Sequence, residues 1–166
     1  MSIDDLDQLL DRFDSRQNKA STGRVTEQSD EELFIAEFEK MRTTSMKPTL
    51  AQLGDKIRAR GHNYAFREGQ FTPPRGSRTQ PDEAFIRMQI YLSNEEKPES
   101  GDDDRRCYLM FRTDSKKKMV QVIASDLTST GGEVTKEGEF MVQQFTPIYV
   151  TEKFVHLFRR LSKKII

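Results

Sequence analysis

Apolar residues of this chain follow helical spacing near both ends and strand spacing in the middle. The first stripe lies in residues 1–14, where Ile3, Leu6, Leu10 and Phe13 are separated by steps of three, four and three positions. This spacing places the four side chains on one face of an α-helix, with aspartates at many of the other positions. So short a helix is marginally stable alone in water, and we expect it to dock onto another surface or to fray.

Residues 15–30 separate this amphipathic segment from the rest of the chain. They are rich in Ser, Thr, Gln and Arg and contain one isolated large apolar residue, Val25. Such a composition is typical of a flexible linker. We therefore divide the chain into an acidic amphipathic helix with its linker, residues 1–28, and a single domain, residues 29–166.

The domain begins with two helical stripes that are out of phase with each other. Ser29 and Glu32 have the spacing of a capping box, which starts a helix. The first stripe comprises Phe34, Phe38 and Met41, and the second comprises Met46, Leu50, Leu53 and Ile57. The second stripe is displaced by one position from the continuation of the first. Pro48 lies near the offset, and proline removes a helical hydrogen bond. The pattern predicts one kinked helix or two abutting helices, ended by Gly61.

After Gly61 the period changes to two. Five segments alternate as strands do, separated by turn-rich or charged breaks: 62–68, 84–93, 107–113, 119–125 and 139–145. The breaks show no helical pattern, which favours antiparallel neighbours over crossover units. A last amphipathic helix follows, with Thr151 as its expected N-cap. Its apolar stripe comprises Phe154, Leu157, Phe158 and Leu161.

The predicted fold class is therefore α+β. An antiparallel sheet of about five strands is flanked by a kinked N-terminal helix pair and a C-terminal helix, and the flexible acidic amphipathic arm precedes them. Charge is divided unevenly along this fold: residues 1–45 carry a net charge of −5, with 11 acidic and 6 basic side chains, and residues 46–166 carry +5, with 16 and 21. The arm and the body are expected to attract each other.

The predicted sheet has apolar residues on both of its faces. In residues 84–93 the even positions are uniformly apolar and are expected to face the core, and in 107–113 the odd positions are. The second face would then carry Phe85, Arg87, Tyr91, Tyr108, Met110 and Arg112. A surface of this kind is rarely left bare, because large exposed apolar patches mark contacts. A helix of the chain, the N-terminal arm or a separate partner would cover it.

Composition adds limits to the class of protein. With 34% hydrophobic and 33% charged residues among 166, the chain is on the polar side of globular proteins. Its one cysteine, Cys107, lies in a strand pattern and is expected to be a small buried apolar residue. A single cysteine cannot form an internal disulfide, which suits a reducing compartment. No apolar run reaches membrane-spanning length, and the first residues do not resemble a signal peptide. We expect a cytoplasmic protein without membrane contact.

The sequence contains no recognisable constellation for catalysis or for a cofactor. Two histidines, His62 and His156, and one cysteine have no metal-ligand spacing. The acidic segment 101–105 lacks the alternation of a calcium loop and is expected to be a solvated loop. Phosphate-binding glycine loops, nucleophile elbows and dinucleotide motifs are absent. We therefore expect no enzymatic activity, no metal and no cofactor.

Basic residues leave a nucleic-acid alternative open. Lys116, Lys117 and Lys118 form a predicted hairpin tip, and Arg75 and Arg78 lie in another break. Together with the arginines and tyrosines of the second face, they would suit phosphates and stacked bases of a single strand. Lysines in turns also keep sheet edges soluble, which is the more ordinary explanation.

The leading hypothesis is a non-enzymatic protein-interaction module, such as an adaptor, a chaperone-like protein or an inhibitor. Its expected contact residues are those of the second face and of the arm, whose spacing suits helix-in-groove recognition. A protein partner is expected, and a homodimer is compatible with the pattern. The arm would bind its own domain or another protein. Single-stranded nucleic-acid binding is the alternative, and a small-ligand or enzymatic pocket between sheet and kinked helix is the third.

Overall fold

The computed structural model describes residues 6–12, 30–92, 106–128 and 131–165, which fall into two units, 1–33 and 34–166. In the N-terminal unit the predicted helix is present over residues 6–12. It carries Leu6 and Leu10 of the expected stripe, and Ile3 and Phe13 lie outside the described residues.

The helix at the start of the domain is continuous, and it changes its winding rather than breaking. Residues 30–41 are α-helical, η1 (Arg42–Met46) is a π-helix, and α2 (Lys47–Arg58) is α-helical again. A π-helical turn contains one extra residue, which explains why the two apolar stripes differ in phase by one position. Gly61 follows with a φ of 93°, in agreement with its predicted role at the helix end.

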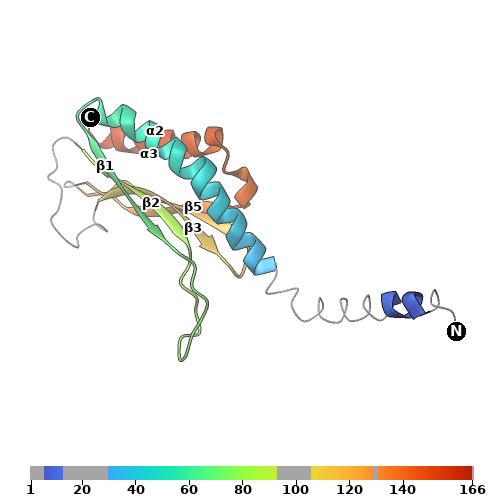
Figure 1. The fold of residues 1–166 in the computed structure, drawn as a ribbon. Helices are drawn as coiled ribbons and strands as arrows, with labels where there is room; N and C mark the ends of the chain where they lie inside the picture. Colours follow the sequence, from blue (N-terminus) through green and yellow to red (C-terminus); the bar gives the residue numbers. More distant parts are fainter. Residues whose placement is uncertain (1–5, 13–29, 93–105, 129–130, 166) are drawn as a thin grey trace. The chain divides into compact units, whose positions relative to one another are not determined.

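Five strands form one antiparallel sheet in the order β1-β2-β3-β4-β5. Each strand pairs with its neighbours in the sequence, so the sheet is a meander: β1 (Asn63–Gly69), β2 (Phe85–Tyr91), β3 (Cys107–Asp114), β4 (Met119–Ser125) and β5 (Val134–Phe140). The connection between β1 and β2 extends beyond the sheet as a long hairpin, closed by the Thr72–Asp82 bridge (Figure 1). This α+β architecture confirms the predicted fold class.

The fifth strand is the main error in the predicted elements. β5 begins at Val134, whereas the sequence pattern placed this strand at 139–145. Residues 142–144 form instead the short 3₁₀ helix η3 (Val142–Gln144), and the buried Phe145 follows it. β5 is an edge strand, and its "VTKEGEF" stretch pairs through its backbone with little apolar alternation. Its pairing with β4 is irregular at Val122 and Ile123, which further obscures the pattern.

The C-terminal helix α3 (Pro147–Ile165) begins four residues before the predicted N-cap Thr151. Proline suits the first turn because its missing N–H would have no helical partner there. Thr146 precedes the helix, and its Oγ1 accepts a hydrogen bond from the backbone N–H of Tyr149 at 3.4 Å. Thr151 instead donates its hydroxyl to the carbonyl of Pro147 inside the helix.

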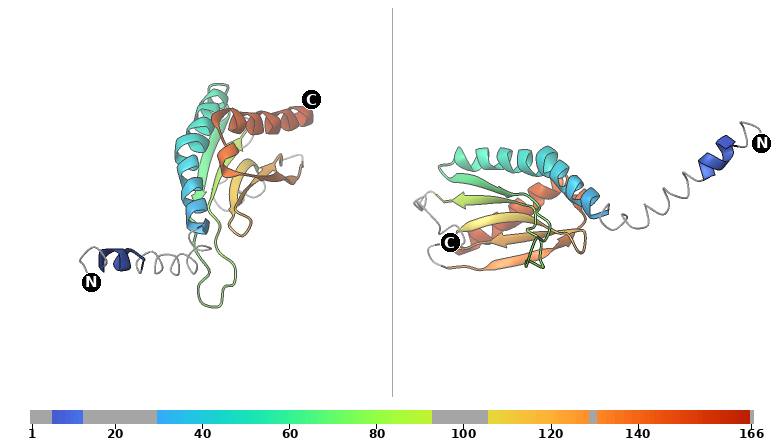
Figure 2. Two further views of the ribbon diagram at one scale, coloured as in Figure 1. Left: turned by 90° about the vertical axis from the view of Figure 1, so that its right-hand side faces the viewer. Right: turned by 60° about the horizontal axis from the view of Figure 1, so that its bottom comes forward.

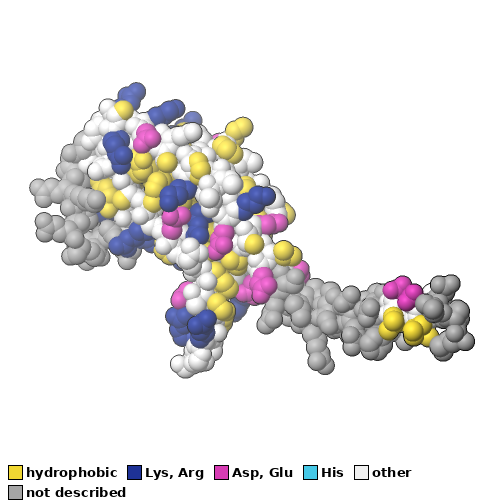
Figure 3. All heavy atoms as spheres, viewed as in Figure 1, with side chains coloured by type: hydrophobic (Ala, Val, Ile, Leu, Met, Phe, Trp, Pro, Cys, Tyr) yellow, Lys and Arg dark blue, Asp and Glu magenta, His cyan; other side chains and the backbone are white. Residues whose placement is uncertain are grey.

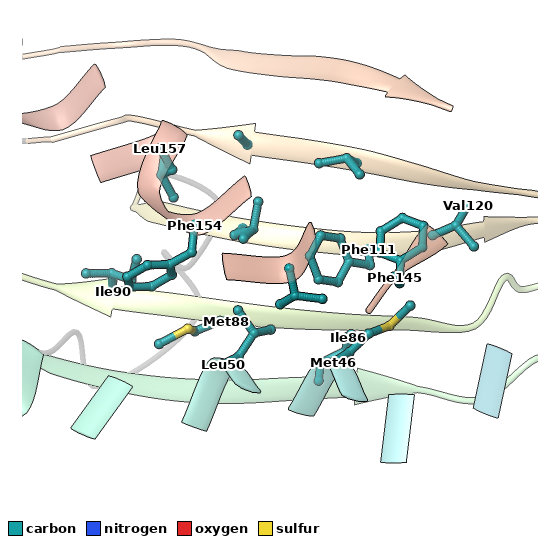
Figure 4. Close-up of a cluster of buried hydrophobic side chains, with 14 of the residues drawn as sticks. Met46, Leu50, Ile86, Met88, Ile90, Phe111, Val120, Phe145, Phe154 and Leu157 are labelled. Carbon is teal, nitrogen blue, oxygen red and sulfur yellow. The ribbon is translucent and has the colours of Figure 1, made fainter. Parts of the chain in front are cut away.

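The helices α2 and α3 lie on one face of the sheet (Figures 1 and 2). Between the two layers is the main core, in which Met46 and Leu50 lie near the sheet residues Ile86 and Met88, and Leu157 of α3 belongs to the same cluster (Figure 4). The buried residues of β2 and β3 on this face include Ile86, Met88, Ile90, Leu109 and Phe111. The predicted orientation of both strands is therefore confirmed.

Candidate functional site

The second face of the sheet carries a small apolar cluster of its own. Tyr108, Met110 and Ile123 are 5–7% exposed and pack with Phe85, apart from the main core. Tyr91 is 5% exposed, and its hydroxyl donates to Gln89 Oε1 at 3.1 Å. Among the described residues, the helices that pack on the sheet do so on the opposite face. The open part of the second face is thus smaller than the strand pattern implies.

A groove opens on this face where β2 and β3 approach the projecting hairpin. Its volume is about 740 Å³, and its lining runs from Gly69 and Gln70 through residues 80–83 to the β3–β4 turn. Four of the predicted contact residues come together in it: Phe85, Arg87, Met110 and Arg112. In register, Arg87 faces Met110 and Phe85 faces Arg112 across the β2–β3 pair. The antiparallel register therefore alternates apolar and cationic side chains along the groove.

Neighbouring side chains hold both arginines of the groove in place. Arg112 donates from Nε and Nη2 to Oε1 of Gln121, at 3.2 and 2.8 Å. The guanidinium of Arg87 lies 4.2 Å from the ring centre of Tyr108, which is cation–π distance. Fixed arginines present their charge at little entropic cost, which suits recognition of a partner.

Glu83 fastens the groove wall to the end of the β3–β4 hairpin. Its carboxylate accepts hydrogen bonds from the hydroxyl of Thr113 at 2.7 Å and from the hydroxyl of Ser115 at 2.8 Å. Thr113 and Ser115 are both buried. Hydroxyl groups that are buried and donate to a carboxylate in this way stabilise the wall, and they are not presented to a substrate.

The groove is lined by charges of both signs. Arg87, Arg112 and Lys116 supply the positive side chains, and Asp82, Glu83 and Asp114 supply the negative ones. Phe85 and Met110 are apolar between them. The groove can therefore meet apolar, anionic and cationic groups of a ligand at short range.

The basic residues of the nucleic-acid alternative are dispersed. Lys116 lines the groove, but Lys117 binds Glu139 of β5 at 3.2 Å, and Arg78 binds Asp82 at 3.0 Å. Arg75 and Lys118 are exposed, and Lys and Arg side chains gather toward the end of the projecting hairpin (Figure 3). Two of these five cations, Lys117 and Arg78, are thus already paired with a nearby carboxylate.

Glu139 is the carboxylate most strongly affected by this pairing. Hydrogen bonds from Lys136 and Lys117 lower the pKa of Glu139 from its ordinary value of 4.5 to about 2. The two ammonium groups lie 2.7 and 3.2 Å from the same oxygen, Oε1. The cluster ties the β3–β4 turn to the edge strand β5.

A second polar cluster, which the sequence did not reveal, lies between β5 and α3. Arg160 binds Glu137 at 2.7 Å and the buried Asp126 at 3.1 Å, and His156 Nε2 lies 3.7 Å from Glu137. These residues line a hollow of about 490 Å³. Because the arginine pairs with both carboxylates, the arrangement serves to join helix to sheet rather than to activate a nucleophile. No local sequence pattern pointed to this cluster, because Asp126 and Arg160 are far apart in the chain.

Two searches of the described residues bear on other kinds of site. In these residues, no three His, Cys, Asp or Glu side chains are grouped as metal binding would require. None of the described helices combines the length and apolar character needed to cross a bilayer. The predicted site residues Ile3 and Phe13 and the acidic segment 101–105 lie outside the described residues.

Comparison with known proteins yields no relative. No family model matches the chain, and no curated protein and no solved structure is significantly similar to it. Function therefore has to be argued from the surface of the molecule.

Proposed function

We propose that this chain is a non-enzymatic protein-interaction module that binds a protein partner in the groove on the second face of the sheet. The observation that carries this proposal is the lining of the groove, where Phe85 and Met110 lie between fixed arginines and carboxylates. Protein interfaces combine apolar anchors with surrounding polar and charged contacts in this way, and arginine is enriched in them. An adaptor, a chaperone-like protein or an inhibitor would use such a surface.

The charge of the groove favours a protein over a nucleic acid. A polyanion gains affinity mainly from cations that neutralise its phosphates. Here Asp82, Glu83 and Asp114 would repel phosphates at the same place where three cations would attract them. A polypeptide segment carries both kinds of charge and can satisfy both. The cationic groups Arg87, Arg112 and Lys116 keep single-stranded nucleic acid as the second candidate.

Site-specific photo-crosslinking tests the proposal in a lysate of the source cells. A photoreactive phenylalanine replaces the exposed Lys116 at the groove, and the matched control replaces Lys40, an exposed lysine of the 30–41 helix. We expect a discrete crosslinked product at position 116 that protease removes and nuclease leaves intact. Protein products of equal size and yield at both positions would contradict the proposal, as would the absence of any product at 116.

The same experiment separates the two candidates. A product at position 116 that nuclease removes, and whose yield falls steeply between 50 and 200 mM salt, would support the nucleic-acid candidate. A protein adduct with weak salt dependence would eliminate it.

A further inference from the structure

A second groove runs along the seam between α2 and α3, on the outer side of the helical layer. Two hollows of about 740 and 380 Å³ lie along it, and both are lined by Val155 and Arg159. Its apolar lining comprises Leu53, Ile57, Phe154, Val155, Phe158 and Ile148. The rings of Phe154 and Phe158 lie 4.8 Å apart and form part of this lining. A seam of this kind suits the apolar face of another helix.

The cations around this groove have no carboxylate partners within the described residues. Lys56, Arg159 and Lys163 line it and take part in none of the ion pairs found there. Other cations of the described surface do form ion pairs, as Lys47 does with Glu68. Within the described part of the chain, these three cations without an ion pair line the apolar seam against one carboxylate, Glu152, which favours an occupant that is both apolar and acidic.

The chain contains a segment with this chemistry at its own N-terminus. Residues 2–14 carry five aspartates and one arginine around the Ile3, Leu6, Leu10 and Phe13 stripe. Over residues 6–12 the segment is helical, and Leu6, Leu9 and Leu10 are each about half exposed. The described helix over residues 6–12 is about 10 Å long, which is enough to place Leu6 and Leu10 in a two-helix seam.

We propose that the α2–α3 groove binds the N-terminal amphipathic helix of a second copy of this chain. Two copies can each supply one helix and one groove, and this reciprocal arrangement is the isologous contact of a twofold dimer. The leucine face enters the seam, and Asp7 and Asp11 meet Lys56 and Arg159. Association therefore depends on opposite charges and weakens with salt. The proposal is independent of the groove on the sheet.

A charge-swap pair in the full-length chain tests this dimer by sedimentation velocity over a concentration series. One variant reverses the helix, Asp7→Lys with Asp11→Lys, and the other reverses the groove, Lys56→Glu with Arg159→Glu. Each variant alone brings like charges together, so we expect its dimer dissociation constant to rise at least tenfold. When the two variants are mixed, both contacts again join opposite charges, and we expect a heterodimer close to wild-type affinity.

A matched control carries Lys40→Glu with Arg60→Glu, which makes the same change of charge at exposed positions outside the groove. Its dimer dissociation constant is expected to stay within twofold of wild type. The proposal is overturned by a wild-type chain that remains monomeric at all concentrations, as it would if the helix bound its own domain or another protein. It is equally overturned by a mixture that forms no heterodimer, or by a control that weakens as much as the groove variant.

Discussion

The ring of Tyr64 in β1 fills the space that a side chain at Gly54 of α2 would need. A Cβ built on Gly54 would lie 2.5 Å from a ring carbon of Tyr64, well inside van der Waals contact. The tyrosine hydroxyl donates to Asp55 at 2.9 Å, and the guanidinium of Arg58 lies 4.3 Å from its ring centre. Burial, followed by the hydrogen bond to Asp55, raises the pKa of Tyr64. The packing of Tyr64 against α2 at this position therefore requires glycine.

We predict that Gly54→Ala destabilises the protein although alanine is the better helix former. The gain in helix propensity is about 1 kcal/mol, whereas forcing the tyrosine ring or the helix aside costs about 1–3 kcal/mol. Urea unfolding followed by circular dichroism measures the net change. In a Tyr64→Ala background the clash is removed, and the same substitution is expected to be neutral or stabilising. An equal loss in both backgrounds would refute the steric explanation.

Arg42 connects the π-helical turn to the strands beneath the sheet groove. Its Nη1 donates to the carbonyl oxygen of Gly69 at 2.9 Å and to that of Phe85 at 3.3 Å, and its Nε lies 3.6 Å from Glu68. The side chain is buried, and Gly69 and Phe85 both line the groove. The unusual helical winding thus places a cation where two strand ends need a hydrogen-bond donor.

We predict that Arg42→Met lowers the free energy of unfolding by about 2–4 kcal/mol, because it removes charged hydrogen bonds in a buried position. Chemical denaturation measures this loss. Arg60→Met serves as the control at an exposed position, where we expect a change within about 0.5 kcal/mol. A loss at position 42 no larger than at position 60 would show that Arg42 does not hold the strands together.

Local periodicity was sufficient to predict most of the fold. Alternation in 84–93 and 107–113 identified the core faces, because one face of each strand packs on helices while the other does not. The one-position offset between the helical stripes marked the π-helical turn, although the sequence alone allowed a kink or a break there. These features depend on neighbours in the sequence, and pattern analysis can reach them.

Features that depend on tertiary pairing escaped prediction. β5 pairs with β4 through its backbone, so its position left no apolar signature, whereas Phe145 is buried without belonging to a strand. The burial of Tyr91 and Tyr108 depends on the packing of their neighbours, which alternation does not report. The α2–α3 groove also forms only when two distant helices meet, and Val155 lies outside the stripe that was predicted for α3.

The Arg160 cluster leads to a prediction about stability. Arg160→Met would remove the ion pair that Arg160 makes with the buried Asp126 and the closest ion pair of Glu137. Removing one partner of such a cluster costs about 3–5 kcal/mol when it is fully buried, and the exposed fraction of Arg160, 20%, lowers our expectation to about 2–3 kcal/mol. Thermal unfolding measures this effect.

The neighbouring Arg159→Met provides the matched comparison for this cluster. Arg159 is exposed and takes part in none of the ion pairs among the described residues, so at concentrations where the chain is monomeric we expect unfolding within about 0.5 kcal/mol of wild type. Similar losses at positions 159 and 160 would indicate a general effect on α3 and would contradict a specific role for the cluster.

The lowered pKa of Glu139 predicts a defined acid response at the sheet edge. Because its pKa is lower in the folded chain than its ordinary value of 4.5, the carboxylate contributes stability above that pH. The contribution is lost as the pH falls from about 4.5 to about 2 and Lys136 and Lys117 lose their partner. Glu139→Gln cannot titrate, so its melting temperature should fall less steeply across this interval than that of wild type.

Melting curves at half-unit pH steps test this, with Glu152→Gln as an exposed control in α3. Parallel curves for wild type and Glu139→Gln would mean that the lysine pairs add no stability to the fold.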